Sequence, residues 1–409
     1  MHVLDLACKS LLDVADFCFA ESNDDENDWG DYGTAEDHQT HSNGRHRRRA
    51  GRPGCGYHLA QRGLRFIILD AHPRIGDAWR NRWDSLRTFT PAHFASLPGM
   101  SFPKHIKQCP TKDEVADYLE SYAEHFHLPV QVSSKVRRVW KEGQRFLVET
   151  QSELWHTDNV IVAMSNYQRP RVPDFAKQLD PAITQLHSHY YRNASQLQPG
   201  DALVVGAGNS GADIAIDLAK DRKTWMAGKE SGHIPPRIDT FFAQHIFFRL
   251  VRFVGHHVLT LATPIGRKNR PKLLHQATPL VRVKPKDLLA AGVQRVPRVV
   301  ATHNGRPLLQ DGRSLDVKNI VWCTGYNPDF SWIDLPVFDD TGLPRHHRGV
   351  ISEAPGLYFV GLHFQFAMSS ATLIGVGRDA KWVVSALESQ ERRSNFVKAP
   401  VRTPRQAYS

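Results

Sequence analysis

Apolar and polar residues follow the pattern of two strand–turn–helix units along this chain. Residues 64–70 form an apolar run that ends in an acid, as buried parallel strands do, and residues 57–63 resemble a helix that stops at a glycine. A second apolar run at 201–205 precedes a glycine-rich turn and helical spacing over 212–220. The repeated unit predicts an α/β fold of two doubly wound, Rossmann-like domains.

The segments around these units fit the same fold class. Apolar residues at helical spacing predict a helix over 111–126, and the short β-like runs of 130–164 predict an antiparallel excursion that ends in a return strand. Further strands are expected at 224–227, 320–325 and 357–361, and a C-terminal helix at 375–387.

Residues 1–50 differ in character from the rest of the chain. Eight acidic residues lie between positions 21 and 37, and a basic run follows at 45–49. Opposite charge blocks without periodicity are typical of disordered segments, so we expect an aberrant, disordered N-terminus.

Composition narrows the function classes. A chain of 409 residues favours two domains, and the net charge of +10 is spread widely enough to indicate a solvated surface rather than nucleic-acid binding. The five cysteines form neither a C-x-x-C pair nor a metal-ligand spacing, which argues against a disulfide reductase and a metal site. No run of eighteen uncharged apolar residues occurs, so we expect a cytoplasmic protein without a membrane-spanning helix.

The glycine-rich turn at 206–211 predicts a dinucleotide site. Gly206 permits the tight turn, Gly208 lets the backbone approach a pyrophosphate, and Gly211 allows the helix to pack closely on the strand. The pyrophosphate would meet the helix N-terminus beside Asn209 and Ser210. At the end of the next strand, where NAD-binding units usually place an acid, the chain has Lys229; a cation suits a 2′-phosphate and favours NADPH, although an ordinary surface lysine is the alternative.

Several motifs together resemble the NADPH-dependent flavin-containing monooxygenases and their bacterial relatives over residues 56–390. Segments 89–91 and 97–103 resemble the family segment beside the isoalloxazine, and 356–361 resembles its late FAD motif. The residues that the resemblance assigns to cofactor binding are Asp70, Gly76, Trp79 and Arg80 for FAD, Thr324 and Gly325 at the interdomain linker, and Gly361 at the late motif.

The resemblance implies an FAD domain (51–175 and 317–390) into which an NADPH domain (176–316) is inserted, followed by a tail at 391–409. It implies FAD and NADPH as cofactors, molecular oxygen and a small organic substrate as reactants, and oxygenation at nitrogen, sulfur or a ketone. Because the flavin carries such chemistry, no catalytic residue is named. An NADPH-dependent flavin oxidoreductase without oxygen insertion and an inactive nucleotide-binding remnant stay open as alternatives.

The chain departs from the family pattern at several places. His187 and Tyr191 keep part of the fingerprint before the NADPH unit, with His187 either a cofactor contact or a structural residue, and Phe89 stands where eukaryotic members have an asparagine beside the flavin. The first FAD strand and glycine loop are also missing before Asp70, where arginines occupy the glycine places. A reading-frame error upstream of residue 56 is one hypothesis, and a divergent, FAD-free protein is the other.

Residues 241–262 are strongly apolar but carry Arg249 and Arg252. A membrane-surface helix, a helix over the active-site mouth and a core helix are all compatible with this pattern. A homo-oligomer is also compatible with the sequence.

Overall fold

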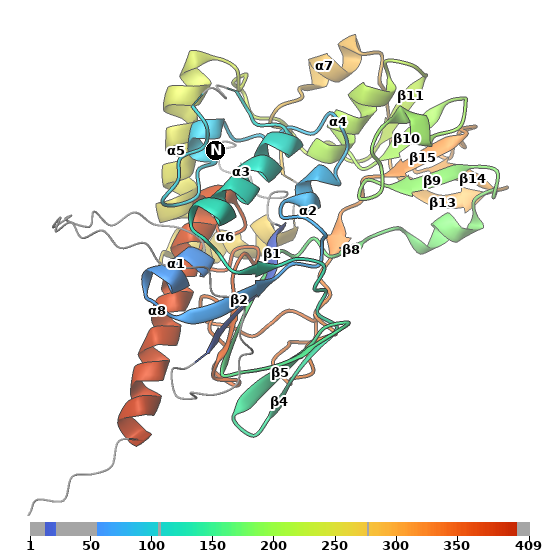
Figure 1. The fold of residues 1–409 in the computed structure, drawn as a ribbon. Coiled ribbons are helices and arrows are strands. Elements are labelled where there is room, and N and C mark those ends of the chain that lie inside the picture. The colour runs from blue at the N-terminus through green and yellow to red at the C-terminus, as the bar shows by residue number, and fades with distance from the viewer. Residues whose placement is uncertain (1–12, 22–54, 105–107, 276–277, 399–409) are drawn as a thin grey trace, which may run out of the picture.

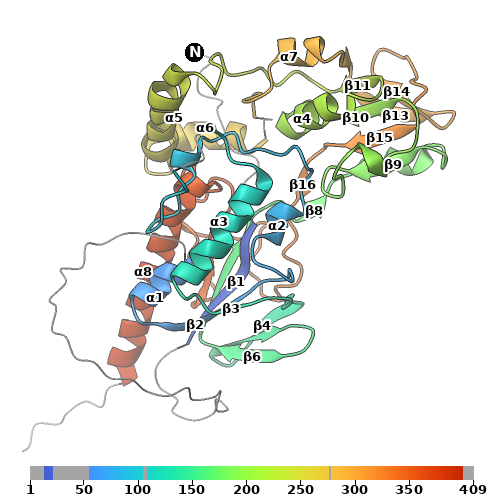
Figure 2. The same cartoon turned by 45° about the horizontal axis from the view of Figure 1, so that its top comes forward.

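The protein is described from a computed structural model, which covers residues 13–21, 55–104, 108–275 and 278–398 (Figure 1). Two α/β units lie side by side, and one of them interrupts the other in sequence (Figures 1 and 2). The α/β class of the prediction is therefore confirmed.

The first unit is built on a five-stranded sheet of order β17-β7-β1-β2-β3. An antiparallel three-stranded sheet, β4-β5-β6, follows β3 in the chain, as expected for residues 130–164. Its strands are β1 (Asp13–Glu21), β2 (Arg65–Leu69), β3 (Val130–Gln131), β4 (Arg138–Glu142), β5 (Arg145–Glu149), β6 (Leu154–Thr157), β7 (Asn159–Met164) and β17 (Leu357–Phe359). Its helices are α1 (Cys55–Gln61), α2 (Asp77–Arg80), η1 (Ala92–Phe94), α3 (Lys112–His125) and α8 (Leu373–Lys398).

The second unit has an all-parallel sheet of order β12-β11-β10-β15-β9, as a doubly wound nucleotide-binding domain requires. Its strands are β9 (Thr184–His187), β10 (Ala202–Val205), β11 (Thr224–Ala227), β12 (Gln294–Val296) and β15 (Asn319–Trp322), with the hairpin β13 (Val299–His303) and β14 (Arg306–Leu309). Its helices are η2 (Asp174–Gln178), η3 (Ala194–Gln196), α4 (Asn209–Leu218) and α7 (Pro285–Ala290).

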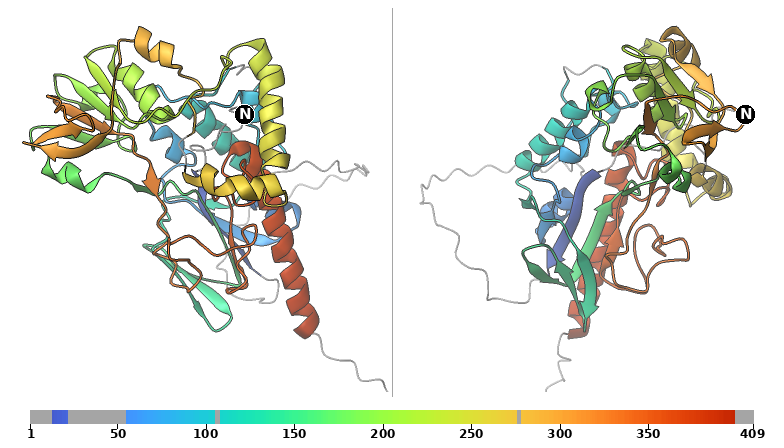
Figure 3. Two further views of the ribbon diagram at one scale, coloured as in Figure 1. Left: turned by 180° about the vertical axis from the view of Figure 1, so that it is seen from behind. Right: turned by 90° about the vertical axis from the view of Figure 1, so that its right-hand side faces the viewer.

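A helical arm leaves the second unit and packs against the first (Figure 3). Its elements are η4 (Ala243–Phe247), α5 (Phe248–Phe253), η5 (Val254–Val258) and α6 (Pro264–His275). The two chain crossings between the units pair as a small antiparallel sheet of β8 (Arg169–Pro170) and β16 (Tyr326–Asn327).

Helix α3 illustrates how local sequence sets an element. The Thr111 hydroxyl accepts a hydrogen bond from Glu114 N at 3.1 Å, and the Glu114 carboxylate accepts one from Thr111 N at 2.7 Å. This reciprocal cap fixes the start of the helix. Val115, Leu119 and Tyr122 then fall on one face and are buried in the core.

Strand β1 corrects two expectations. Residues 13–21 form the middle strand of the first sheet, so this part of the N-terminus is not disordered and the sheet does not lack a central strand. However, β1 runs antiparallel to both β2 and β7, whereas β2 and β3 are parallel to one another, as are β7 and β17. The rest of the expected disordered segment, residues 1–12 and 22–50, lies outside the described residues, as do the glycines at 51 and 54.

At the other end, α8 is longer than predicted. It continues through Lys398, so the first eight residues of the expected tail are helical, while residues 399–409 lie outside the described part. Among the described helices, none combines the length and apolarity that crossing a membrane requires.

Candidate cofactor and active site

The turn between β10 and α4 has the geometry of a pyrophosphate cradle. Gly206 has φ +119°, and a Cβ there would lie 2.2 Å from the Cys323 carbonyl oxygen. A Cβ at Gly211 would lie 1.8 Å from the Gly206 carbonyl oxygen. At Gly208, by contrast, no described atom lies within 4 Å of the Cβ position. Packing within the chain therefore requires the first and third glycines, and only the second faces open space where a ligand can approach.

The polar residues at the start of α4 hold a neighbouring loop. The Asn209 amide donates to the Pro279 carbonyl oxygen at 3.0 Å and its oxygen accepts from Val281 N at 2.9 Å. Asp213, one turn further on, forms an ion pair of 2.8 Å with Arg282. Burial raises the pKa of Asp213, and the Arg282 guanidinium opposes that rise. Asn209 thus positions the loop beside the cradle, while Ser210 is half-buried in the first turn of α4.

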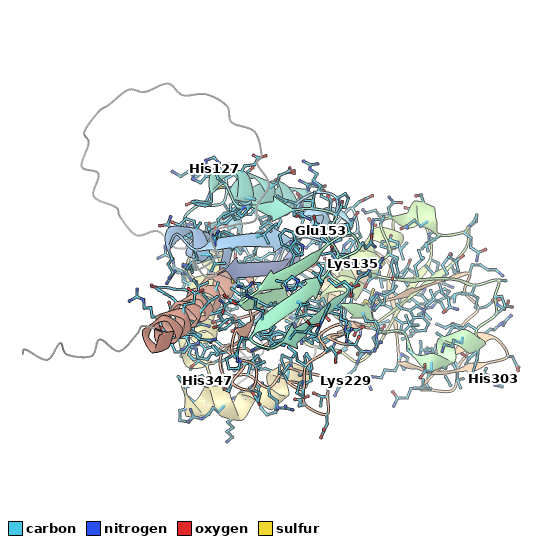
Figure 4. All side chains as sticks on the ribbon, turned by 60° about the horizontal axis from the view of Figure 1, so that its bottom comes forward. His127, Lys135, Glu153, Lys229, His303 and His347 are labelled. Carbon is cyan, nitrogen blue, oxygen red and sulfur yellow. The ribbon has the colours of Figure 1, made fainter. Side chains whose placement is uncertain are left out.

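Lys229 is exposed one residue after Gly228, at the carboxyl edge of the second sheet (Figure 4). The neighbouring strand β12 brings Arg295 to the same place, where its Nη2 donates to the Gly228 carbonyl oxygen at 3.3 Å. Sequence reasoning missed Arg295 because 66 residues separate it from Lys229, and only the β11–β12 pairing joins them.

In the first unit, Asp70 directly follows β2 and is buried at 5% exposure. One carboxylate oxygen accepts the His72 backbone N–H at 2.9 Å. Gly76 then starts α2 with φ +86°, and a Cβ there would lie 2.8 Å from the Ala116 carbonyl oxygen on α3. The glycine is needed because α2 crosses α3 at this close distance.

Trp79 and Arg80, both on α2, differ in whether their side chains have hydrogen-bond partners among the described residues. Trp79 is buried, and no described residue accepts a hydrogen bond from its indole Nε1. Arg80 is already engaged by α3, because its Nη2 lies 2.8 Å from Asp117 and 3.0 Å from Glu120. The structure therefore gives Arg80 a role in positioning α2, and leaves the Trp79 indole N–H as a donor for a bound group.

The segment predicted to line the flavin is fixed against α3. The Tyr118 hydroxyl accepts from Leu97 N at 2.7 Å and donates to the Met100 carbonyl oxygen at 2.7 Å. The Tyr122 hydroxyl donates to the Pro98 carbonyl oxygen at 3.0 Å. Phe89 is buried in the same core, so a rigid apolar wall stands where the resemblance places the isoalloxazine.

The interdomain linker is held by hydrogen bonds to backbone carbonyl oxygens. Arg171 donates from Nη2 to the Thr324 carbonyl oxygen at 2.7 Å, and the Thr324 hydroxyl donates to the Arg171 carbonyl oxygen. Gly325 has φ +82° and accepts from Arg171 N at 2.9 Å. Arg82, which sequence reasoning missed, donates to the Tyr326 hydroxyl at 2.9 Å and so connects the α2 region to this linker.

His187 is a structural residue of this linker. It is 4% exposed, its Nδ1 accepts from His189 N at 3.1 Å, and its Nε2 lies 3.1 Å from the Gly325 carbonyl oxygen. The first contact makes Nδ1 the acceptor, so Nε2 carries the proton and donates. Burial lowers the pKa of His187 to about 4, which keeps the ring neutral.

Gly361 follows β17 with φ +90° and is buried where the chain turns towards α8. The residue before it, Val360, donates to the Val162 carbonyl oxygen at 2.9 Å and keeps the turn on the sheet. Asp70, Trp79, segment 89–103 and Gly361 all belong to the first unit, where the resemblance places the flavin.

The pyrophosphate end of that site differs from a Rossmann unit. A first strand normally runs parallel to its neighbours and delivers the glycine loop at their carboxyl edge. Here Glu21, at the carboxyl end of β1, pairs with Arg65 at the amino end of β2. Strand β1 therefore ends at the opposite edge, and residues 22–54, which join it to α1, lie outside the described part. The described residues fit the adenosine and isoalloxazine sides of FAD and supply no phosphate turn after β1.

Comparisons with known proteins place the chain among flavin-dependent oxidoreductases. Residues 53–234 match the family described as pyridine nucleotide-disulphide oxidoreductase. An uncharacterized oxidoreductase CzcO-like of Geobacillus kaustophilus is 38% identical over 335 residues, which cover 81% of this chain and 93% of that protein. A probable indole-3-pyruvate monooxygenase, YUCCA3 of Arabidopsis thaliana, is 28% identical and is covered over 78% of its length.

The fold has a counterpart among solved structures. A flavin-containing monooxygenase from Stenotrophomonas maltophilia superposes with a TM-score of 0.65 at 27% sequence identity. The alignment covers 82% of this chain and 94% of that protein.

Proposed function

This chain belongs to the flavin-containing monooxygenase-like family, whose cofactors are FAD and NADPH, and we propose that it oxygenates a small organic substrate at nitrogen, sulfur or a ketone. The observation that carries the proposal is the open face of Gly208, in a unit whose linker is joined to the α2 region of the first unit by the hydrogen bond from Arg82 to the Tyr326 hydroxyl. The glycine turn of the second unit and the first unit, which contains segment 89–103, are thus connected through this linker.

The chain's own residues bind and orient. The backbone around Gly208 and the start of α4 would hold the NADPH pyrophosphate, while Lys229 and Arg295 would receive the 2′-phosphate. Asp70 would hold the FAD ribose, Trp79 would donate from its free indole N–H, and Gly361 would let the backbone approach the flavin. When bound, FAD supplies hydride acceptance and oxygen activation.

Exclusion of water is the other task of these residues. Phe89, Leu97 and Phe102 are buried on the flavin-side wall, and the two tyrosine hydroxyls of α3 hold this wall in place. A dry, rigid wall protects reactive intermediates from side reactions. This division of labour explains why the site needs no catalytic triad.

The test begins with the visible spectrum of the full chain after incubation with FAD and removal of free flavin. Equimolar flavin, followed by NADPH consumption that matches oxygenated product from an amine, sulfide or ketone panel, supports the proposal. NADPH consumption that yields only hydrogen peroxide instead assigns the chain to the oxidoreductases without oxygen insertion. Colourless protein that still binds NADPH overturns the proposal and identifies a nucleotide-binding remnant.

A cytoplasmic location and a homo-oligomeric state are finer proposals. The described cysteines, Cys55, Cys109 and Cys323, are all free thiols, which suits a reducing compartment. Subcellular fractionation and sedimentation velocity test the two points separately.

A further inference from the structure

The helical arm has two faces of opposite kind. On its inner face, Ala243, Phe247 and Phe248 are buried, and the rings of Phe248 and Phe94 lie 6.3 Å apart. A Cβ at Gly255 would lie 2.7 Å from the Met368 side chain, so the helix contacts the first unit closely. The inner face of the helix therefore packs against the first unit.

The outer face is apolar and exposed. Phe242, Ile246, Leu250 and Phe253 are spaced by four, four and three residues, which places them along one side of the helix. Their exposed fractions are 54%, 55%, 55% and 57%, respectively. We call these four residues the outer stripe. Core helices bury such residues, whereas a row of exposed apolar residues is typical of an interaction surface.

The segment of the sequence that contains the outer stripe is basic. Between Asp239 and Asp287 the sequence contains nine lysines and arginines and no aspartate or glutamate. Arg249 and Arg252 are exposed within the same helix, and Arg267 and Lys268 are exposed on α6. Figure 3 shows α5 and α6 meeting on the outside of the molecule beside α8. Exposed aromatic and aliphatic residues flanked by cations match the interface of an anionic bilayer, where rings enter the acyl boundary and cations meet lipid phosphates.

We propose that the outer stripe, with Arg249 and Arg252, docks the enzyme on the surface of an anionic lipid bilayer. The helix lies in the plane of the interface and does not cross it, in agreement with its length and its charges. This contact is independent of the oxygenation chemistry, so it holds or fails separately from the proposed function.

The experiment is co-sedimentation of the full chain with vesicles of phosphatidylcholine, with and without phosphatidylserine. Binding should require phosphatidylserine and weaken as salt is raised. L250S/F253S should lower the partition coefficient roughly 30-fold, because two half-exposed side chains lose their transfer into the interface. R249E/R252E should lower it at least as much, since each cation contributes about fivefold and the new carboxylates are repelled.

Matched controls separate the outer stripe from general properties of a basic protein. K135E/R137E makes the same change in charge at exposed residues of the first unit (Lys135 is labelled in Figure 4), and L154S/V300S removes two exposed apolar side chains elsewhere. Both should bind as the wild type does. Equal loss in these controls, or no phosphatidylserine-dependent binding at all, overturns the proposal. A wild-type dimer that L250S/F253S converts to a monomer in sedimentation velocity, with vesicle binding unchanged, assigns the outer stripe to a second copy and also overturns it.

Discussion

Substituting alanine for each glycine of the Gly206 turn should separate the fold from the ligand site. At Gly208 the backbone is extended, with φ −84°, and no described atom lies within 4 Å of the added Cβ. Alanine is a poorer helix N-cap than glycine, by about 0.5–1 kcal/mol. The lost freedom of the unfolded chain offsets this by about 0.4–1 kcal/mol. The free energy of unfolding of G208A should therefore stay within about 1 kcal/mol of the wild-type value.

NADPH binding should respond in the opposite way. The Cβ of G208A would occupy the space through which the pyrophosphate approaches, and overpacking of this kind costs about 1–3 kcal/mol. The dissociation constant for NADPH should accordingly rise about 5- to 150-fold. At Gly211 the Cβ would stand 1.8 Å from the Gly206 carbonyl oxygen, so G211A should lose about 3 kcal/mol or more of folding stability before any ligand is added.

Urea unfolding followed by tryptophan fluorescence measures the free energy of unfolding, and isothermal titration calorimetry measures the dissociation constant for NADPH. Gly292 provides a control, because it has φ +77° and open surroundings after α7. G292A should lose about 1 kcal/mol of stability and bind NADPH normally. Wild-type affinity in G208A would refute the ligand role of this turn, and a G208A variant as unstable as G211A would refute the distinction between the glycines.

Three further predictions concern other links between sequence and function. K229A and R295A should each raise the KM for NADPH roughly tenfold and leave that for NADH unchanged, and equal losses with both nucleotides would contradict a 2′-phosphate site. C18P removes a backbone donor from a strand that is paired on both sides and should lower the free energy of unfolding by about 3 kcal/mol. The control L154P, on the edge strand β6, should have only a small effect. Wild-type stability of C18P would mean that β1 is not in the sheet. Because the folded-state pKa of His187 lies near 4, below its ordinary value, the unfolded chain takes up the proton first and stability falls as pH drops through this window. Between about pH 7 and about pH 5 the wild type should lose free energy of unfolding, and H187Q should remove up to roughly 2 kcal/mol of that loss. Urea unfolding at both pH values measures the difference, and an unchanged pH dependence in H187Q would contradict the buried neutral ring.

The sequence by itself determined the elements whose signals are local. The glycine turn at 206–211 lies between an apolar strand and a helix, so its identity follows from steric and electrostatic rules that act within about ten residues. The capped helix α3 and the antiparallel strands β4 to β6 were predictable for the same reason. Motif resemblance then identified the family, which the relatives confirm.

Tertiary structure alone decided what depends on pairing between distant segments. Arg295 reaches Gly228 only because β12 joins the edge of the second sheet, and Arg80 is held by α3 carboxylates that no local pattern connects to it. Strand β1 shows the limit most clearly. Its sequence looked unstructured beside a charged segment, yet the open position between β2 and β7 offers two rows of backbone hydrogen-bond partners. Strand pairing satisfies those groups in either direction, so the sheet, rather than the local sequence, determines that residues 13–21 are extended.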